Sequence, residues 1–245
     1  MIDYHCHILP GLDDGAKDVA ESLAMARLLA DAGFREVCCT PHCIRGSYDT
    51  TPAQVRQAVA SLQAVLNREG VALRLRAGME YYLDEYFLGL DELLPLGDSR
   101  LVLVEAPSQG NMAVIGDGVF RIVRQGLIPL FAHPERCALL AVPGTEGFID
   151  RLWSRFATAD AKIAAQNSLH MLKEMGCRFQ GNLGSFSGVY GRQVAERARA
   201  MLAQGLYACL GSDGHRPEPL AKVLASPVMG EAGVREVLGN GAVGD

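Results

Sequence analysis

The sequence lacks several features that would assign it to a membrane-bound or nucleic-acid-binding class. It has no apolar run of 18 residues or more, which a membrane-spanning helix requires. It has no concentrated run of Lys and Arg, and its formal net charge is −5, so a face for backbone phosphates is not expected. Its first residues do not show the charged start, apolar core and cleavage site of a secretion signal. We therefore expect a soluble, unexported, cytoplasmic protein without nucleic-acid partners or membrane insertion.

The sequence also lacks the Cys-x-x-Cys spacing of many zinc and redox sites. Its seven cysteines are an odd number, and most of them lie inside apolar, strand-like runs. Free thiols of this kind are typical of reduced intracellular proteins, where they pack as small apolar residues. We expect most of these positions to be core thiols: Cys6, Cys38, Cys39, Cys43, Cys137, Cys177 and Cys209.

The sequence does contain enough apolar residues for one sizeable core. Of its 245 residues 49% are hydrophobic, and no repeat or linker divides the chain, so we expect a single domain over residues 1–245. Helical patterns end at Gly33, Gly70 and Gly205. Seven short apolar runs predict strands between such helices, at 1–7, 35–40, 71–77, 100–105, 127–132, 177–182 and 206–211.

This alternation of strands and helices indicates an α/β fold with a parallel sheet. We expect the sheet to close as a seven-stranded, TIM-like (β/α)7 barrel, and an open doubly wound sheet is the alternative. The barrel is favoured because polar residues follow the carboxyl ends of the strands, where barrel enzymes hold their functional side chains. The sixth histidine, His170, lies in a helical pattern instead, and we expect it to be an ordinary surface or half-buried residue. The strand-end positions are His42, Glu80, Glu105, His133, Asp213 and His215.

The opening strand carries the first polar cluster, His5-Cys6-His7. Side chains alternate between the two faces of a strand, so Asp3, His5 and His7 point one way and Cys6 points the other way. The two imidazoles can therefore share one metal ion. Asp13 and Asp14 follow in the segment LDDG, where they could form a turn or send one carboxylate to the same ion.

A single histidine at a strand end is more often a hydrogen-bonded core residue than a metal ligand. Here five histidines and four carboxylates share the strand-end pattern. Imidazole nitrogens with carboxylate oxygens suit Mn, Fe or Zn. Because one transition-metal ion takes only four to six ligands, this number of candidates predicts two or three ions.

Two arginines lie beside the predicted ligands. Arg136 belongs to the segment HPER, and Arg216 directly follows His215. A guanidinium next to clustered cations would be repelled unless an anion also occupied the site. Both arginines therefore indicate an anionic substrate.

Several motifs, in order and spacing, resemble one known family: HCHILPGLDDG, TPH, GMEYYLD, LVLVE, AHPER and GSDGH. The resemblance is to the polymerase-and-histidinol-phosphatase (PHP) superfamily, in particular its bacterial capsule-type branch of metal-dependent protein-tyrosine phosphatases. It covers residues 1–136 and 170–217 and implies a distorted seven-stranded PHP barrel. It also implies three divalent ions, with manganese expected first and iron or zinc as alternatives. The implied ligands are His5, His7, Asp14, His42, Glu80, Glu105, His133, Asp213 and His215.

The resemblance further implies that Arg136 and a second arginine bind phosphate. The family places that second arginine a few residues beyond the last histidine, whereas Arg216 is immediately adjacent to His215. Residues 137–169, which include Trp153, match poorly, so the rim that contacts substrate is expected to differ.

These features predict a phosphomonoester hydrolase that uses a metal-bound hydroxide. The arginines and ions would neutralise the phosphoryl oxygens. A metal-bound water, His42 or His215 could supply the proton to the leaving group. The resemblance implies, as partner, a phosphotyrosine-bearing segment of a bacterial tyrosine kinase that controls polysaccharide biosynthesis and export.

Three alternatives remain beside this prediction. Cys39 and Arg45 satisfy the Cys-x5-Arg pattern of cysteine-dependent phosphatases, but Pro41 removes a backbone donor and no glycine lies between them. A non-catalytic metal-bound scaffold is disfavoured because every expected ligand type is present. Another PHP enzyme, such as a histidinol-phosphate phosphatase or an exonuclease, would share the metal site, and the acidic net charge and the length count against the exonuclease.

Overall fold

The computed structural model describes residues 1–107, 111–140 and 168–239, and these form an α/β fold. Every one of the seven predicted strands is present, and two short ones are added, β3 and β5. The strands are β1 (Ile2–Cys6), β2 (Glu36–Cys39), β3 (His42–Cys43), β4 (Arg74–Ala77), β5 (Glu80–Tyr82), β6 (Leu101–Glu105), β7 (Ile128–Ala132), β8 (Arg178–Asn182) and β9 (Tyr207–Gly211).

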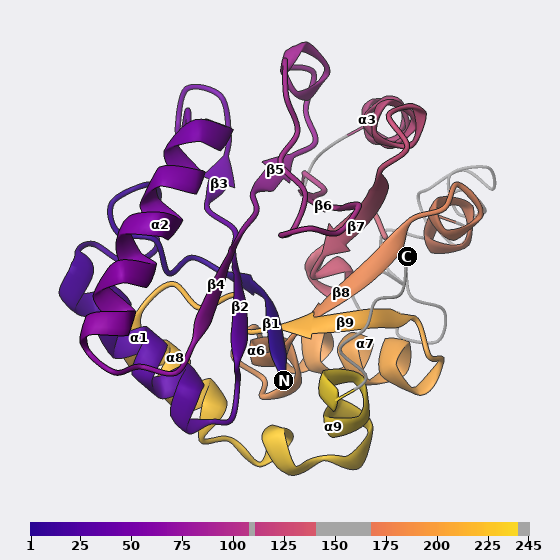
Figure 1. Cartoon of the computed structure of the whole chain (residues 1–245). Coiled ribbons are helices and arrows are strands. Elements are labelled where there is room, and N and C mark those ends of the chain that lie inside the picture. The colour runs from indigo at the N-terminus through magenta and orange to yellow at the C-terminus, as the bar shows by residue number, and fades with distance from the viewer. Residues whose placement is uncertain (108–110, 141–167, 240–245) are drawn as a thin grey trace.

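Helices alternate with these strands along the chain (Figure 1). In the picture α1 and α2 flank the sheet that contains β4, and α3 and α7 lie on the side of β7 to β9. The α-helices whose bounds both lie within the described residues are α1 (Val19–Asp31), α2 (Pro52–Arg68), α3 (Met112–Arg124), α6 (Leu183–Phe186), α7 (Arg192–Ala203), α8 (Pro217–Leu224) and α9 (Ala232–Gly239). Three short 3-10 helices are η1 (Phe87–Gly89), η2 (Pro134–Arg136) and η3 (Pro227–Gly230).

Local sequence signals set the ends of the long helices. At the start of α1, Asp18 Oδ1 accepts a hydrogen bond from the Glu21 N–H at 2.9 Å. At the start of α2, Thr51 and Gln54 form a reciprocal capping box, in which each side chain accepts a hydrogen bond from the backbone N–H of the other residue. Gly70 follows α2 with a φ of +68°, a left-handed conformation that ends the helix as predicted.

The described strands form two parallel sheets. One has the order β1-β2-β4, and the other has the order β3-β5-β6-β7-β8-β9. Only residues 40–41 separate β2 from β3, and only residues 78–79 separate β4 from β5, so the chain passes from the first sheet to the second at both places. The parallel α/β architecture is thus confirmed, whereas the hydrogen bonds divide the predicted single barrel sheet into two parts.

The two sheets meet again at their other edges, between β1 and β9. The Asp213 N–H donates to the carbonyl of His5 at 2.7 Å, and the His7 N–H donates to the carbonyl of Gly214 at 2.9 Å. These bonds hold the carboxyl end of β1 beside the chain that leaves β9. The first and last polar motifs of the sequence are therefore neighbours in space.

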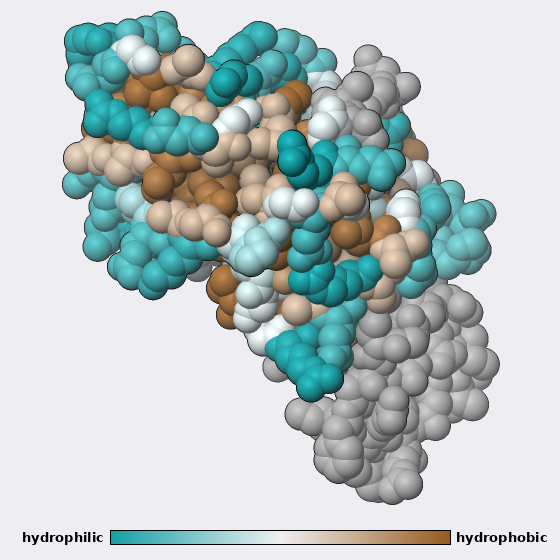
Figure 2. Space-filling view, turned by 90° about the horizontal axis from the view of Figure 1, so that it is seen from below, coloured by the Kyte–Doolittle hydropathy of each residue, from teal (hydrophilic) through white to brown (hydrophobic). Residues whose placement is uncertain are grey.

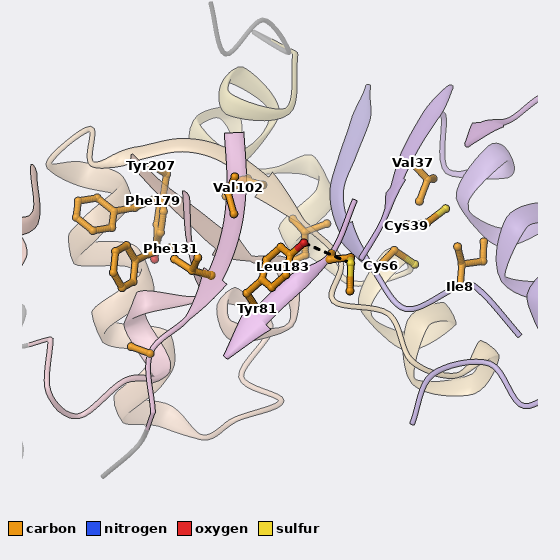
Figure 3. Close-up of a cluster of buried hydrophobic side chains, with 14 of the residues drawn as sticks. Cys6, Ile8, Val37, Cys39, Tyr81, Val102, Phe131, Phe179, Leu183 and Tyr207 are labelled. Carbon is orange, nitrogen blue, oxygen red and sulfur yellow. Dashed lines mark hydrogen bonds between the residues drawn. The ribbon is translucent and has the colours of Figure 1, made fainter. Parts of the chain in front are cut away.

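Alternating side chains of the central strands pack into two buried clusters. In β6, Val102 and Val104 belong to the larger cluster, which Figure 3 shows in part, and Leu101 and Leu103 belong to the smaller one. Glu105 continues the face of Leu101 and Leu103, because side chains two apart share a face of a strand. The smaller cluster consists of Tyr4, Cys38, Leu96, Leu101, Leu103, Leu130, Ala132 and Cys209. The apolar interior thus leads directly to the polar residues at the strand ends.

The surface mixes hydrophilic and apolar side chains. Seen from below, hydrophilic side chains occupy much of the margin of the described surface, and apolar side chains gather toward the left of the view (Figure 2). Within the described residues, no helix combines the length and the apolar character needed to cross a bilayer.

Candidate metal centre

The opening strand delivers its two histidines as the alternation predicted. His5 and His7 are both fully buried, and their Nε2 atoms lie 3.0 Å apart. The Cys6 thiol lies elsewhere and donates to the Gly214 carbonyl at 3.5 Å. The register of β1 thus aims two imidazole nitrogens at one point.

Two carboxylates and a third histidine surround that point. Glu80 Oε2 lies 3.2 Å from His5 Nε2 and 3.3 Å from His7 Nε2. Asp213 Oδ1 lies 3.4 Å from each of the same nitrogens. His133 Nε2 lies 3.1 Å from Glu80 Oε1. We call His5, His7, Glu80, His133 and Asp213 the deep cluster, because at most 6% of each side chain is exposed.

A second group lies nearer to solvent. Asp14 Oδ1 is 3.6 Å from His42 Nε2 and 3.5 Å from His215 Nε2. Glu105 Oε1 lies 3.9 Å from His133 Nε2. We call Asp14, His42, Glu105 and His215 the rim cluster, because between 15% and 49% of each side chain is exposed. The deep and rim clusters together contain all nine predicted ligands.

The two clusters share atoms in a way that fits several ions. Three sets of potential ligand atoms each lie within 4.8 Å of one another: His5, His7 and Glu80; His42, Glu80 and Glu105; and His7, Asp14, His42 and His215. Glu80 belongs to two of the sets, as do His7 and His42. A carboxylate or imidazole with two ligand atoms can reach two ions, so the sets describe one connected centre.

Unsatisfied buried atoms support this interpretation. Glu80 Oε2 and His42 Nδ1 are buried without a hydrogen bond, although they lie 3.0 Å apart. A buried polar atom without a partner costs about 1–3 kcal/mol, and native proteins rarely leave one. A cation bound between nitrogen and oxygen ligands would satisfy both atoms. The residues present therefore fit divalent metal ions.

Two neighbouring groups orient the deep imidazoles, and the sequence did not identify either role. Asp13 Oδ2 lies 2.7 Å from His7 Nδ1, and Gln180 Oε1 lies 3.0 Å from His5 Nδ1. Bonds at Nδ1 turn both Nε2 atoms toward the centre. Asp13 Oδ2 also accepts from the backbone N–H of His42 at 2.9 Å. Of the two aspartates, Asp13 thus orients His7 through a hydrogen bond, and Asp14 belongs to the rim cluster.

The carboxylates and imidazoles of the deep cluster shift each other's pKa values. Burial disfavours the charged form of His5, but the charges of Glu80 and Asp213 outweigh it and raise the pKa of His5 to about 9. Burial is likewise outweighed at His7, where hydrogen bonds to carboxylates, first that of Asp13, raise the pKa well above its usual value. Burial opposes ionisation of Glu80 and Asp213 too, yet the charge of His5 holds both pKa values well below the usual range.

Two of the deep residues have unusual backbone conformations. His133 has a φ of 33° and Asp213 a φ of 51°, and among the described residues they alone combine a positive φ with a side chain. Left-handed conformations are disfavoured for residues with a Cβ, and such strain is often found at functional sites. His133 directly follows β7, and Asp213 lies two residues after β9, so both strained positions are in the turns that leave strands.

The two predicted phosphate-binding arginines differ in their surroundings. Arg136 Nη1 donates to Asp213 Oδ2 at 2.6 Å, so this guanidinium is attached to the deep cluster. Arg216, the residue before α8, donates through Nη1 to Glu21 Oε2 of α1 at 2.9 Å. Arg136 therefore adjoins the predicted ions, and Arg216 would have to leave Glu21 to bind an anion.

The remaining predicted residues are placed away from the centre. The side chain of His170 is 75% exposed, as expected for a surface position. Cys39 is fully buried, and burial raises its thiol pKa well above the usual value, which disfavours the thiolate that a nucleophile needs. Arg45 stacks on the Tyr86 ring. Trp153 and most of the divergent stretch 137–169 lie outside the described residues.

Comparison with known proteins shows which protein family the sequence of this chain matches. Residues 1–148 match the model described as "Capsular polysaccharide synthesis, CpsB/CapC". Tyrosine-protein phosphatase YwqE of Bacillus subtilis is 32% identical over 219 residues, which cover 88% of this chain and 77% of that protein. Tyrosine-protein phosphatase CpsB of Streptococcus pneumoniae is 26% identical, over 88% of this chain and 83% of that protein.

Solved structures agree with the sequence comparison. The crystal structures of YwqE from Bacillus subtilis and CpsB from Streptococcus pneumoniae are described as metal-dependent tyrosine phosphatases, and the match has a TM-score of 0.76 at 28% identity, over 97% of this chain and 91% of that one. Histidinol phosphate phosphatase from Lactococcus lactis shares the fold, with a TM-score of 0.56 at 12% identity over 96% of this chain and 93% of that one. The chain therefore belongs to the CpsB/CapC family of capsular polysaccharide synthesis proteins, the capsule-type branch of PHP enzymes that its motifs predicted.

Proposed function

We propose that this chain is a metal-dependent protein-tyrosine phosphatase. The observation that carries the proposal is the meeting of five imidazoles and four carboxylates near the carboxyl ends of the strands, with the Arg136 guanidinium bonded to one of those carboxylates. The relatives YwqE and CpsB, named as tyrosine phosphatases, support the same activity.

We infer that all nine residues of the deep and rim clusters are ligands and that they hold three ions. The three overlapping sets of ligand atoms support this number. Manganese is our first candidate, with iron or zinc as alternatives, because mixed nitrogen and carboxylate ligands suit these metals. When bound, the ions would lower the pKa of water at the site and neutralise charge on the phosphoryl oxygens.

The side chains around the centre have separate tasks in this proposal. Arg136 binds the phosphoryl group, because a guanidinium forms strong, directional bonds with phosphate oxygens. Arg216 joins it once substrate draws this arginine away from Glu21. A tyrosine leaving group has a pKa of about 10, so a weak acid suffices to protonate it, and His42 and His215 are the two imidazoles at the exposed edge.

For the fold, we infer one domain with a distorted seven-stranded barrel of the PHP type. Two observations support it: the short interruptions after β2 and β4, and the backbone hydrogen bonds that join β1 to the end of β9. If β2 with β3 and β4 with β5 are each one bent strand, the order of pairing describes a closed ring.

For the substrate, we propose a phosphotyrosine-bearing segment of a bacterial tyrosine kinase of polysaccharide biosynthesis and export. The description of the family as capsular polysaccharide synthesis proteins supports this partner. The seven free thiols support a reducing, cytoplasmic location.

The decisive experiment is a substrate panel with metal-stripped and manganese-reloaded protein. It compares a phosphotyrosine peptide, a phosphoserine peptide, histidinol phosphate and single-stranded DNA by kcat/KM. We expect the phosphotyrosine peptide to be preferred in the reloaded protein. A preference of about tenfold or more for another substrate would remove the chain from the tyrosine-phosphatase class and leave the metal centre standing.

A further inference from the structure

The face of the Arg136 guanidinium is covered by an aromatic ring. Arg136 Cζ lies 4.3 Å from the centre of the Tyr190 ring, well within the range of a cation–π interaction. Arg136 lies in η2, directly after β7, whereas Tyr190 lies between α6 and α7. The contact therefore depends on the tertiary fold and gives no signal in the sequence.

The same tyrosine belongs to a closed set of contacts. The Asn182 side-chain amide donates to Asp213 Oδ2 at 2.8 Å and also contacts the Tyr190 hydroxyl at 3.4 Å. Asp213 Oδ2 accepts in turn from Arg136 Nη1. We call Arg136, Tyr190, Asn182 and Asp213 the arginine clamp. It holds the guanidinium by one edge through Asp213 and by one face through Tyr190.

The backbone beneath the ring is shaped to receive it. A Cβ added to Gly184 would come within 3.2 Å of Tyr190 Cε2, so any larger residue at Gly184 would push against the ring. Gly188 and Gly191 flank the tyrosine with φ values of 81° and 90°, which residues with a Cβ rarely adopt. Three glycines thus let this loop place Tyr190 against Arg136.

Among the described residues, the clamp engages only one nitrogen of the Arg136 guanidinium, Nη1, in a hydrogen bond. A guanidinium has five N–H groups, and in the described part of the chain no residue accepts a hydrogen bond from Arg136 Nε or Nη2. An arginine with a fixed plane and free donors is prepared to bind phosphate without first losing side-chain freedom.

We propose that Tyr190 is a positioning residue for the phosphoryl group: it fixes the plane of Arg136 and so increases the affinity of the site for phosphate. The inference rests on the proposed function, because it gives Arg136 a phosphate to bind. A purely structural tyrosine would instead support the loop, and its loss would act independently of Arg136.

The test compares Tyr190→Ala, Tyr190→Phe, Arg136→Ala and the double variant Tyr190→Ala with Arg136→Ala, all manganese-loaded. The readouts are kcat/KM for a phosphotyrosine peptide, the inhibition constant of inorganic phosphate, and metal content. We expect Tyr190→Ala to lower kcat/KM and weaken phosphate inhibition by about tenfold, with metal content unchanged. Tyr190→Phe should stay within about twofold of the parent, because the ring is kept.

The double variant separates the two roles. We expect it to be no worse than Arg136→Ala alone, because the tyrosine then has no guanidinium to position. The matched control is Tyr86→Ala, which removes a comparable exposed tyrosine that stacks on Arg45 at 4.8 Å, and it should leave phosphate inhibition unchanged.

Additive losses in the double variant, or unchanged phosphate inhibition in Tyr190→Ala, would overturn the proposal. Equal losses in Tyr190→Phe and Tyr190→Ala would assign the effect to the hydroxyl and overturn the stacking role. Calorimetric titration of the manganese-loaded proteins with inorganic phosphate measures the same affinity without turnover. If the parent binds phosphate through the clamp but hydrolyses no phosphotyrosine, the proposed function fails and the positioning role of Tyr190 stands.

Discussion

The deep and rim clusters of the metal centre use the same kinds of side chain in opposite environments. At most 6% of each deep imidazole is exposed, and Asp13 and Gln180 orient two of them through hydrogen bonds to Nδ1. The rim residue Asp14 is 49% exposed, and its closest nitrogens in the centre are 3.5 Å and 3.6 Å away. Pre-organised ligands lose little freedom when an ion binds, whereas exposed ones must be ordered by it. The deep cluster should therefore govern metal affinity, and the rim should govern access of substrate.

Removal of all ions is the most drastic test, because it disables both clusters at once. Dialysis against a chelator should abolish hydrolysis of a phosphotyrosine peptide, and added manganese should restore it. Elemental analysis must accompany each activity measurement. Full activity in a preparation without transition metal would refute the metal centre itself.

The next largest effect should come from Glu80, the deep carboxylate that belongs to two of the three ligand sets. Glu80→Ala removes this carboxylate from both sets. It should therefore reduce metal stoichiometry and lower kcat by at least about three orders of magnitude. Asp14→Ala is the matched rim variant and should cost only about tenfold, because this carboxylate is half exposed. Unchanged metal content in Glu80→Ala, or equal losses of kcat in Glu80→Ala and Asp14→Ala, would show that the deep and rim clusters do not differ in function.

The two arginines that we propose bind phosphate, Arg136 and Arg216, should also differ in how much they contribute to kcat/KM. Arg136→Ala should keep the ions and lower kcat/KM by about two orders of magnitude, roughly 3 kcal/mol of lost transition-state stabilisation. Arg216→Ala should lower it by less than about fivefold, because Arg216 is partly exposed and ion-paired with Glu21. Loss of metal from Arg136→Ala would show that this arginine supports the deep cluster instead of the substrate.

The smallest effect concerns pH and the metal-free protein. The pKa of His5 is raised to about 9 in the fold, so its stabilising contribution is complete below pH 6.5 and is lost as the pH rises through 9. We expect the Tm of the metal-free protein to fall by a few degrees between pH 7 and pH 9.5, on the order of 1 kcal/mol. The metal-loaded protein should not show this fall, because bound ions replace the protons.

A pair of variants assigns that pH effect to one cluster. His5→Asn should reduce the fall in Tm of the metal-free protein, and the remaining fall should come from His7, whose pKa is also raised. His215→Asn should retain the fall in full. An undiminished fall in His5→Asn would show that His5 is not a source of the pH effect.

The sequence predicted most of this site because strand geometry is local. Alternation placed His5 and His7 on one face, and parallel strands brought the later strand ends to them, so nine ligands could be proposed from motifs alone. The positions of the seven main strands along the chain, and the ends of α1, α2 and α7 near Gly33, Gly70 and Gly205, were predicted from local patterns as well. Such patterns encode the position of each side chain relative to its neighbours in the sequence.

The supporting residues could not be predicted, because their roles depend on contacts between distant segments. In the sequence, nothing distinguishes Gln180 of β8 or the loop residue Tyr190 from other glutamines and tyrosines. Only the fold shows that Gln180 contacts His5 and that Tyr190 stacks on Arg136. Asp13 and Asp14 are adjacent, and only the turn decides which of them faces His7. The division of the strands into two sheets depends likewise on two-residue interruptions that no periodicity marks.

The strained turns at His133 and Asp213 have a consequence for how such a protein can change over generations. Glycine would relax the backbone at either position, so selection for heat resistance alone favours replacing two residues that we propose as metal ligands. Selection for catalysis favours keeping them and tolerating the strain. Improvements in durability should therefore accumulate in the helices and outer loops, far from these two turns, in any lineage that still uses the enzyme.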